Sequence, residues 1–246
     1  YESSVDGVIS TQTPDITGNS LFTTSTLSTG VHVITATVTD SSGEIGSDQL
    51  TLEINTPPVV SNIAITPNSA VYIDETLTCS ATVTDPDESL SPTYSWQINW
   101  DVNCTDGCAD EVGTGPTFEL TSISPSPLDE IYCVASTIDI HGWEDSQFTN
   151  IVIDNRDPMV VLTAPADGVV INLGDTVTFE SISSDPDVSS DQLAVEYISA
   201  KDGSLGVPTE LPSSGLNSYD YSSLSPGLHS ITAVVRDNHF GQGISV

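Results

Sequence analysis

Acidic residues recur at two places in the chain in a pattern that suits cation binding. The chain contains Asp85-Pro86-Asp87-Glu88, and Asp185-Pro186-Asp187 follows a matching stretch one hundred residues later. Carboxylates this close repel one another, and calcium prefers six to eight oxygen ligands at about 2.3 to 2.6 Å. The plainer interpretation is a turn, in which Asp binds the backbone and Pro fixes φ. Both interpretations depend on which strands hold these residues.

Cysteine and histidine offer less chemistry. The chain has four cysteines, an even number that favours disulfides in an oxidising, extracellular compartment. Cys104 and Cys108 suit a local disulfide that would stiffen a loop; zinc is the rival interpretation, weakened because no second cysteine pair or His lies nearby in the sequence. His32 and His229 occupy repeated positions, and no G-x-S-x-G or H-E-x-x-H motif occurs. We therefore expect the protein not to be an enzyme.

The elements that must position these residues are strands. Leu27 to Asp40 and Leu224 to Asp237 share Leu, Ser, Gly, His, Ile, Thr, Ala, Val and Asp in register, within runs that alternate apolar and polar residues. No helical periodicity is evident, and Pro and Gly interrupt many short strand-like runs. The sequence predicts an all-β fold of tandem sandwiches.

Two short linkers divide the repeats. They read Asn55-Thr56-Pro57-Pro58 and Asp154-Asn155-Arg156-Asp157-Pro158, and their prolines interrupt strand ladders and stiffen the backbone. Domains are therefore predicted at residues 1–56, 57–156 and 157–246, arranged end to end. The first should be the C-terminal part of a domain, the second complete, and the third should lack its last strand.

Composition excludes several classes of partner. Three Lys and Arg residues oppose 35 Asp and Glu residues, a formal net charge of −32. Such a chain is repelled by nucleic acid and by anionic lipid, and an acidic, soluble surface explains the charge without any ligand. No apolar run approaches the roughly 20 residues needed to cross a bilayer, so no membrane insertion is expected in this segment.

Three core positions identify a family. Cys79, Trp96 and Cys133 stand in the order of the immunoglobulin pattern, and the repeated L-S-x-G-x-H-x-I-T-A-x-V-x-D strand with its D-P-D turn resembles the polycystic-kidney-disease-type (PKD-type) and cadherin-like repeats of microbial surface proteins. The resemblance implies immunoglobulin-like sandwiches, a Cys79–Cys133 disulfide across the core, and a role in spacing or adhesion. In the third domain Phe179 replaces Cys79, Tyr197 replaces Trp96 and Ile231 replaces Cys133. We therefore expect the core of that domain to be held by packing alone.

The same topology gathers the acids at the linkers, because the start of a domain and its B–C and F–G loops share one end. At the second linker this predicts a calcium site from Asp154, Asp157, Asp185, Asp187 and Asp237, with Asn155 and Asn238 as neutral donors. At the first linker it predicts one from Asp85, Asp87, Glu88 and Asp139, with Asn55. Arg156 could instead neutralise part of the charge.

These features favour a non-catalytic spacer of an extracellular or cell-surface repeat protein, stiffened by calcium and contacting neighbouring immunoglobulin-like domains of its own polypeptide or of adjacent subunits. One alternative is an adhesin module that binds a surface glycan or protein, with Trp100 and Trp143 as candidate stacking residues. Another is a self-assembling filament or surface-layer subunit in which neighbours donate missing strands.

Overall fold

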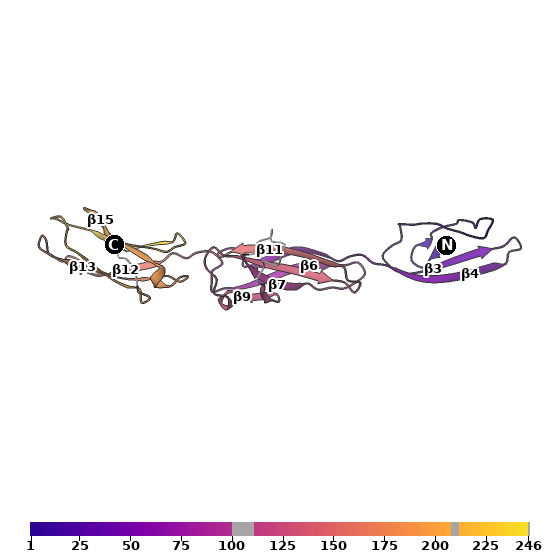
Figure 1. The fold of residues 1–246 in the computed structure, drawn as a ribbon, viewed down its shortest axis with the longest axis horizontal. Coiled ribbons are helices and arrows are strands. Elements are labelled where there is room, and N and C mark those ends of the chain that lie inside the picture. The colour runs from indigo at the N-terminus through magenta and orange to yellow at the C-terminus, as the bar shows by residue number, and fades with distance from the viewer. Residues whose placement is uncertain (100–110, 208–211, 246) are drawn as a thin grey trace. The chain divides into compact units, whose positions relative to one another are not determined.

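The computed structural model describes residues 1–99, 111–207 and 212–245, and almost all of its regular structure is antiparallel strand (Figure 1). Within these ranges two single-turn 3₁₀ helices interrupt the strands, η1 (Leu120–Ser122) and η2 (Ser190–Gln192). The predicted all-β class is therefore confirmed. Among the residues so described, no helix has the length and apolar character needed to cross a membrane.

Two compact units make up the chain. Unit 1 comprises Tyr1–Ala64, Ser80–Tyr94 and Val134–Phe148, and unit 2 comprises Ile65–Cys79, Ser95–Cys133 and Thr149–Val246. This division passes through strands of the middle segment. The domain boundaries that the sequence predicts after residues 56 and 156 remain predictions.

The first segment forms one four-stranded sheet in the order β2-β1-β3-β4. Its strands are β1 (Glu2–Ser3), β2 (Gly7–Val8), β3 (Gly30–Thr39) and β4 (Ile45–Ile54). His32 and Ile34 are buried on one face, whereas Val38 on the same face is 55% exposed. Its repeat counterpart Val235 is fully buried beneath a second sheet. Within the described residues this segment forms one sheet, and its assignment as the C-terminal part of a domain stays a prediction.

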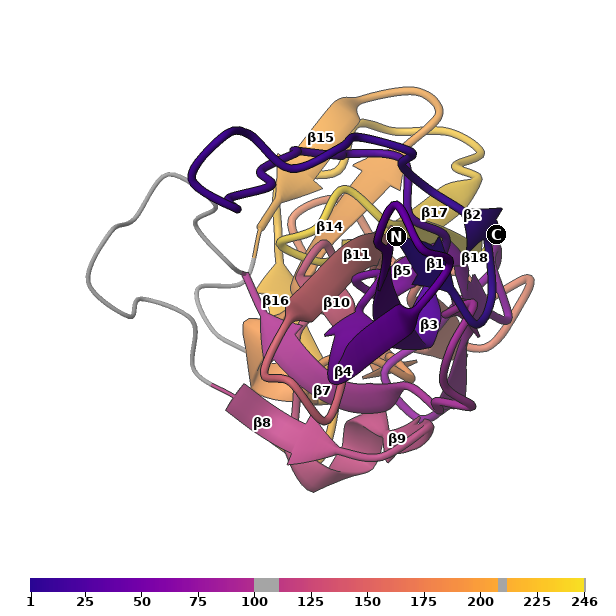
Figure 2. The same cartoon turned by 90° about the vertical axis from the view of Figure 1, so that its right-hand side faces the viewer.

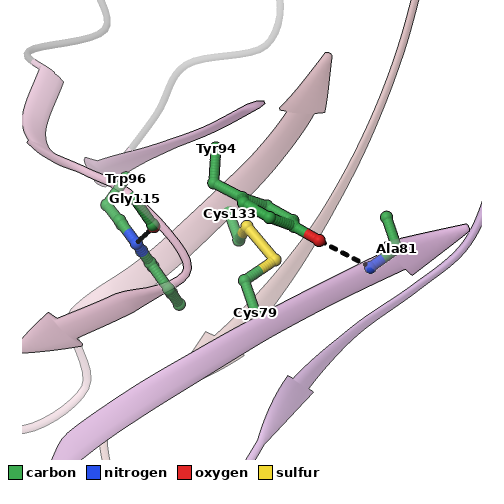
Figure 3. The surroundings of a disulfide bond; sticks show 6 residues. All are labelled: Cys79, Ala81, Tyr94, Trp96, Gly115 and Cys133. Carbon is green, nitrogen blue, oxygen red and sulfur yellow. Dashed lines mark hydrogen bonds between the residues drawn. A yellow bond between two sulfur atoms is a disulfide. The ribbon is translucent and has the colours of Figure 1, made fainter. Parts of the chain in front are cut away.

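The middle segment folds as a three-stranded sheet, β5-β6-β9, and a four-stranded sheet, β11-β10-β7-β8, and the pairing of β7 with β8 can be followed in Figure 2. The strands are β5 (Val59–Thr66), β6 (Thr76–Thr84), β7 (Thr93–Ile98), β8 (Glu111–Thr114), β9 (Thr117–Glu119), β10 (Glu130–Ile138) and β11 (Glu144–Val152). A disulfide joins Cys79 of β6 to Cys133 of β10 and so links the two sheets (Figure 3). Trp96 of β7 is fully buried beside it.

The third segment repeats this arrangement with sheets β12-β13-β16 and β15-β14-β17-β18. Its strands are β12 (Met159–Ala164), β13 (Val177–Ser184), β14 (Ala194–Ser199), β15 (Gly203–Gly206), β16 (Leu216–Tyr221), β17 (Ile231–Arg236) and β18 (Gln242–Ser245). Apolar side chains from both sheets form one core. The shared order of three plus four strands, bridged in the middle segment across its two sheets, is that of immunoglobulin-like sandwiches.

One expectation about the third segment needs correction. The sequence predicts that its last strand is missing, but β18 pairs with β17, with four residues where β11 has nine. The turn before it closes between Asp237 and Gly241, so the strand can begin at Gln242. The strand is therefore present.

Candidate functional site

One Asp builds the turn between the last two strands of each segment. These residues are Asp40, Asp139 and Asp237, and in each case Oδ1 accepts the backbone N–H groups of the residues two and four positions later over 2.7 to 2.9 Å. The repeated geometry explains why Asp ends the matching strand motifs. It leaves Oδ2 of each carboxylate free of the turn's own backbone bonds.

A second Asp builds the turn that follows β6 in the middle segment and the turn that follows β13 in the third segment. Oδ1 of Asp85 and of Asp185 accepts the backbone N–H groups two and three positions later, over 2.6 to 3.2 Å. The turn interpretation of Asp-Pro-Asp therefore accounts for one oxygen of each. The other oxygen, Oδ2, is buried in both, without a hydrogen-bond partner among the described residues.

The linkers join these two kinds of turn through the same two bonds. Nδ2 of Asn55 donates to Oδ2 of Asp139 over 2.8 Å, and Nδ2 of Asn155 donates to Oδ2 of Asp237 over 2.8 Å. The next backbone N–H donates to the Asp-Pro-Asp turn, from Thr56 to Oδ2 of Asp87 over 3.2 Å in the first linker. Both linkers are thus fastened to two loops of the segment that follows.

At the first linker the two carboxyls of the Asp-Pro-Asp turn contact each other. The interaction between these side chains raises the pKa of Asp85 and lowers that of Asp87. Burial opposes ionisation of Asp139, but the bonds from Asn55 and from the turn's backbone outweigh it and lower its pKa. One proton or one cation would relieve the repulsion between these groups.

The second linker carries the same cluster in a more buried form. Burial, followed by the charges of Asp187 and Asp237, raises the pKa of Asp185. Oδ1 of Asn155 is also buried without a hydrogen-bond partner in the described ranges. Burial again opposes ionisation of Asp237, yet the bond from Asn155 and those of the turn lower its pKa.

The predicted ligand sets are brought together only in part. Asp154 and Asn238 have exposed side chains, and Oδ1 of Asp157 accepts the N–H of Gln242 over 3.3 Å at the start of β18. The backbone N–H of Ile140 donates a hydrogen bond to Oε2 of Glu88 over 3.4 Å. Among the described residues, no three His, Cys, Asp or Glu side chains form a ready-made metal site.

Other predicted residues have separate outcomes. Cys104, Cys108 and Trp100 lie outside the described residues, so their disulfide, zinc and stacking interpretations stay predictions. Sequence reasoning missed a contact that Arg156 makes with Asp74, which lies 82 residues earlier. The sequence indicated that Arg156 could neutralise charge at the linker, but it gave no signal that pointed to Asp74 as a partner.

Ser, His and Asp side chains do meet twice, but not in a catalytic arrangement. Nδ1 of His32 lies 2.6 Å from Oγ of Ser3 and Nε2 lies 2.7 Å from the carbonyl oxygen of Ser28; His229 makes the equivalent contacts in the third segment. A carbonyl can only accept, so Nε2 donates to it. Asp6 also approaches the Nδ1 side, at 3.6 Å. In a Ser-His-Asp triad the serine and the carboxylate bond opposite ring nitrogens, so these clusters hold strands together instead.

Comparisons with protein-family models and with curated proteins found no match. Among solved structures, the fibronectin(III)-like modules of Clostridium thermocellum CbhA match with 16% identity over 74% of this chain and 89% of theirs, at a TM-score of 0.32. A tetra-tandem repeat from the extending region of a large adhesion protein matches with 14% identity over 90% and 56%, at 0.38. A Ca²⁺-stabilized adhesin with which an Antarctic bacterium binds ice matches with 16% identity over 88% and 56%, at 0.30. The chain spans just over half the length of the last two, and the immunoglobulin-like sandwich assignment stands on its own sheet topology.

Proposed function

We propose that this chain is a non-catalytic spacer of an extracellular or cell-surface repeat protein, of PKD-type or cadherin-like character, and that calcium stiffens its linker at residues 55–58. The observation that carries the proposal is the repeated fastening of each linker. The same Asn amide and the same backbone N–H bind acidic side chains of two loops at residues 55–56 and at residues 155–156. If the linkers were flexible tethers, the same hydrogen bonds would not be expected in both of them. The low similarity to solved structures lends it no weight.

The residues at the first linker fit calcium by their chemistry. Asp85, Asp87, Asp139 and Asn55 supply only hard oxygen donors, and the buried Oδ2 of Asp85 is available for a ligand. When bound, calcium would supply the two positive charges that these carboxylates lack. The chain's own part is to hold the donors on two turns that their Oδ1 bonds keep in place.

The test is a calorimetric titration of calcium into the metal-stripped chain, followed by melting with and without the ion. We expect micromolar to millimolar binding and a raised melting temperature, both weakened in Asp85→Asn. Asp167→Asn, at an exposed position in the loop after β12, is the matched control. Absence of binding heat together with unchanged melting would overturn the calcium part and leave an acidic spacer.

A second candidate function is an adhesin module that binds a surface glycan. It is favoured by Trp143, which is 58% exposed. The next residue in the sequence, Glu144, lines a shallow groove together with Thr93, Ser136 and Ser146. An exposed aromatic face suits stacking on a sugar ring, and the hydroxyls and carboxylate of the groove suit hydrogen bonds to its hydroxyl groups. A glycan panel probed with the chain and with Trp143→Ala tests it: binding that the variant retains would contradict this site.

A further inference from the structure

Arg156 binds the Asp-Pro-Asp turn of the third segment with its side chain as well as its backbone. Its Nε and Nη2 donate to Oδ1 of Asp187 over 2.8 and 2.6 Å, and its backbone N–H donates to Oδ2 over 2.5 Å. The Asp187 side chain is fully buried. A planar guanidinium that meets a carboxylate with two donors gives a strong and directional bond. Both oxygens of Asp187 are therefore occupied.

The other side of the same guanidinium binds the middle segment. Nη2 and Nη1 donate to the two oxygens of Asp74 over 3.0 and 3.3 Å, and the guanidinium carbon lies 4.8 Å from the centre of the Tyr72 ring. Tyr72 and Asp74 belong to the loop between β5 and β6. Nearby, the N–H of Asp154 donates to the carbonyl of Val71 over 2.7 Å. Arg156 thus spans two loops that are more than one hundred residues apart in sequence.

Among the described residues, the first linker has no cationic bridge of this kind. Thr56 stands where the second linker has Arg156, and its backbone N–H binds Asp87 in the equivalent way. Its side chain makes a neutral contact instead, with the hydroxyl 2.5 Å from Oγ1 of Thr29 in the first segment. Near this linker, Nε2 of His141 lies 3.3 Å from Oε2 of Glu53. The two linkers therefore share the bonds made by the Asn amide and by the next backbone N–H, and only the second carries a cationic side chain at that next position.

Metal ligation is also less well served at the second linker. With both Asp187 oxygens taken by Arg156, the side-chain donors that remain for a cation there are Asp185, Asp237 and Asn155. The Arg156 bond also lowers the pKa of Asp74, which keeps that carboxylate ionised to more acidic pH. Charge that a metal would otherwise supply is already provided by the chain.

We infer that Arg156 is a metal-independent latch, which holds the linker at residues 154–158 between Asp74 and Asp187, so that sensitivity to chelators is confined to the linker at residues 55–58. The second half of this inference rests on the proposed function, because it presupposes calcium at the first linker. The first half stands on the Arg156 contacts alone.

Hydrogen–deuterium exchange of the two linkers, with calcium and with chelator, tests the latch in the whole chain. In the chain as it is, chelator should speed exchange of residues 53–56 at least tenfold and change that of residues 154–157 less than threefold. In Arg156→Thr, which reproduces the first linker's residue, residues 154–157 should exchange at least tenfold faster in chelator. Arg236→Thr, which removes the exposed pair with Glu196, is the matched control and should leave both linkers unchanged.

The outcomes separate the two ideas. If Arg156→Thr exchanges as slowly as the unchanged chain in chelator, or if both linkers of the unchanged chain loosen equally, the latch is wrong. If residues 53–56 ignore chelator while Arg156→Thr still loosens residues 154–157, the calcium proposal fails and the latch stands. Should Arg156→Thr not fold, Arg156→Lys replaces it. One ammonium cannot hold both carboxylates with paired bonds, so residues 154–157 should exchange faster than in the unchanged chain but more slowly than expected for Arg156→Thr. Exchange as slow as in the unchanged chain would contradict the latch.

Discussion

The middle and third segments have the same pair of sheets but lock their cores in different ways. In the middle segment Cys79 and Cys133 join the sheets covalently, and the indole N–H of Trp96 donates to the carbonyl of Gly115 over 2.8 Å (Figure 3). In the third segment Phe179 takes the place of Cys79 and stacks on Tyr197 with ring centres 5.4 Å apart. One core is tied by a covalent bond and the other by side-chain fit.

The third core also contains hydrogen bonds, which corrects the expectation that packing alone holds it. Tyr197 is fully buried, and its hydroxyl lies 2.9 Å from Oγ of Ser181 and accepts from Nδ2 of Asn217 over 3.2 Å. The reason is the exchange of Trp for Tyr, because a buried hydroxyl must find partners. Ser181 and Asn217 are both buried and supply them.

The disulfide of the middle segment and the hydrogen bonds around Tyr197 in the third segment act on different states of the chain. A disulfide stabilises chiefly by restricting the unfolded chain, whereas a buried hydrogen-bond network acts only when the fold has placed its members. The first should therefore respond to reduction and the second to the loss of a single polar atom.

The largest expected effect is from removing the disulfide. In the Cys79→Ala, Cys133→Ala double variant the free energy of unfolding of the middle segment should fall by about 4 kcal/mol, because the bridge closes a loop of 54 residues. All three tryptophans lie in this segment, so denaturant unfolding followed by tryptophan fluorescence reports on it. Exchange protection of β13 and β17 should be unchanged. An unmoved fluorescence midpoint would contradict the assigned role.

Tyr197→Phe should have the next largest effect. It removes one hydroxyl and leaves Ser181 and Asn217 buried with an unmet bond, at a cost of about 1 to 3 kcal/mol confined to the third segment. Exchange protection of β14 and β17 measures it, and Tyr221→Phe at the half-buried end of β16 is the control. Equal stability of both variants would show that packing does suffice.

Gly241→Ala should sharpen the comparison at the turns, because the middle segment has Trp143 at the equivalent position. A Cβ at Gly241 would collide with Oδ2 of Asp237 and Nδ2 of Asn155. We expect a loss of about 1 to 2 kcal/mol in the third segment as one bond of the linker is displaced. Thermal melting of both variants measures the loss. Gly46→Ala, whose Cβ would meet only a side-chain carbon of Val38 at 3.7 Å, should lower the melting temperature less. A larger loss in Gly46→Ala than in Gly241→Ala would contradict the collision at Gly241.

The smallest effect concerns pH. The pKa of Asp185 is raised in the folded chain, so its contribution to stability is complete below the ordinary carboxyl pKa and is lost as pH rises through the raised value. At pH 7 without calcium, Asp185→Asn should therefore stabilise the third segment, by less than about 1 kcal/mol because the group is partly solvated. Melting between pH 3 and pH 7 in chelator checks this. A variant less stable than the unchanged chain at pH 7 would reverse the sign.

The repeat spacing, the alternating strands and the Cys–Trp–Cys order were readable from the sequence, because each depends on local periodicity or on a residue type with few uses. They predicted the sandwich fold and placed Asp85, Asp139, Asp185 and Asp237 in turns beside the linkers. The fold that positions the candidate site was thus largely determined by local patterns.

Only the tertiary structure decided which partners those acids take. Asn55 meets Asp139 and Asn155 meets Asp237 across more than 80 residues, and Arg156 lies between Asp74 and Asp187. The exposed position of Asp154 and the hydroxyl network around Tyr197 were likewise set by packing. Hydrogen bonds and ion pairs act over a few ångströms in space, and sequence spacing does not record which side chains the folded sheets bring within that distance.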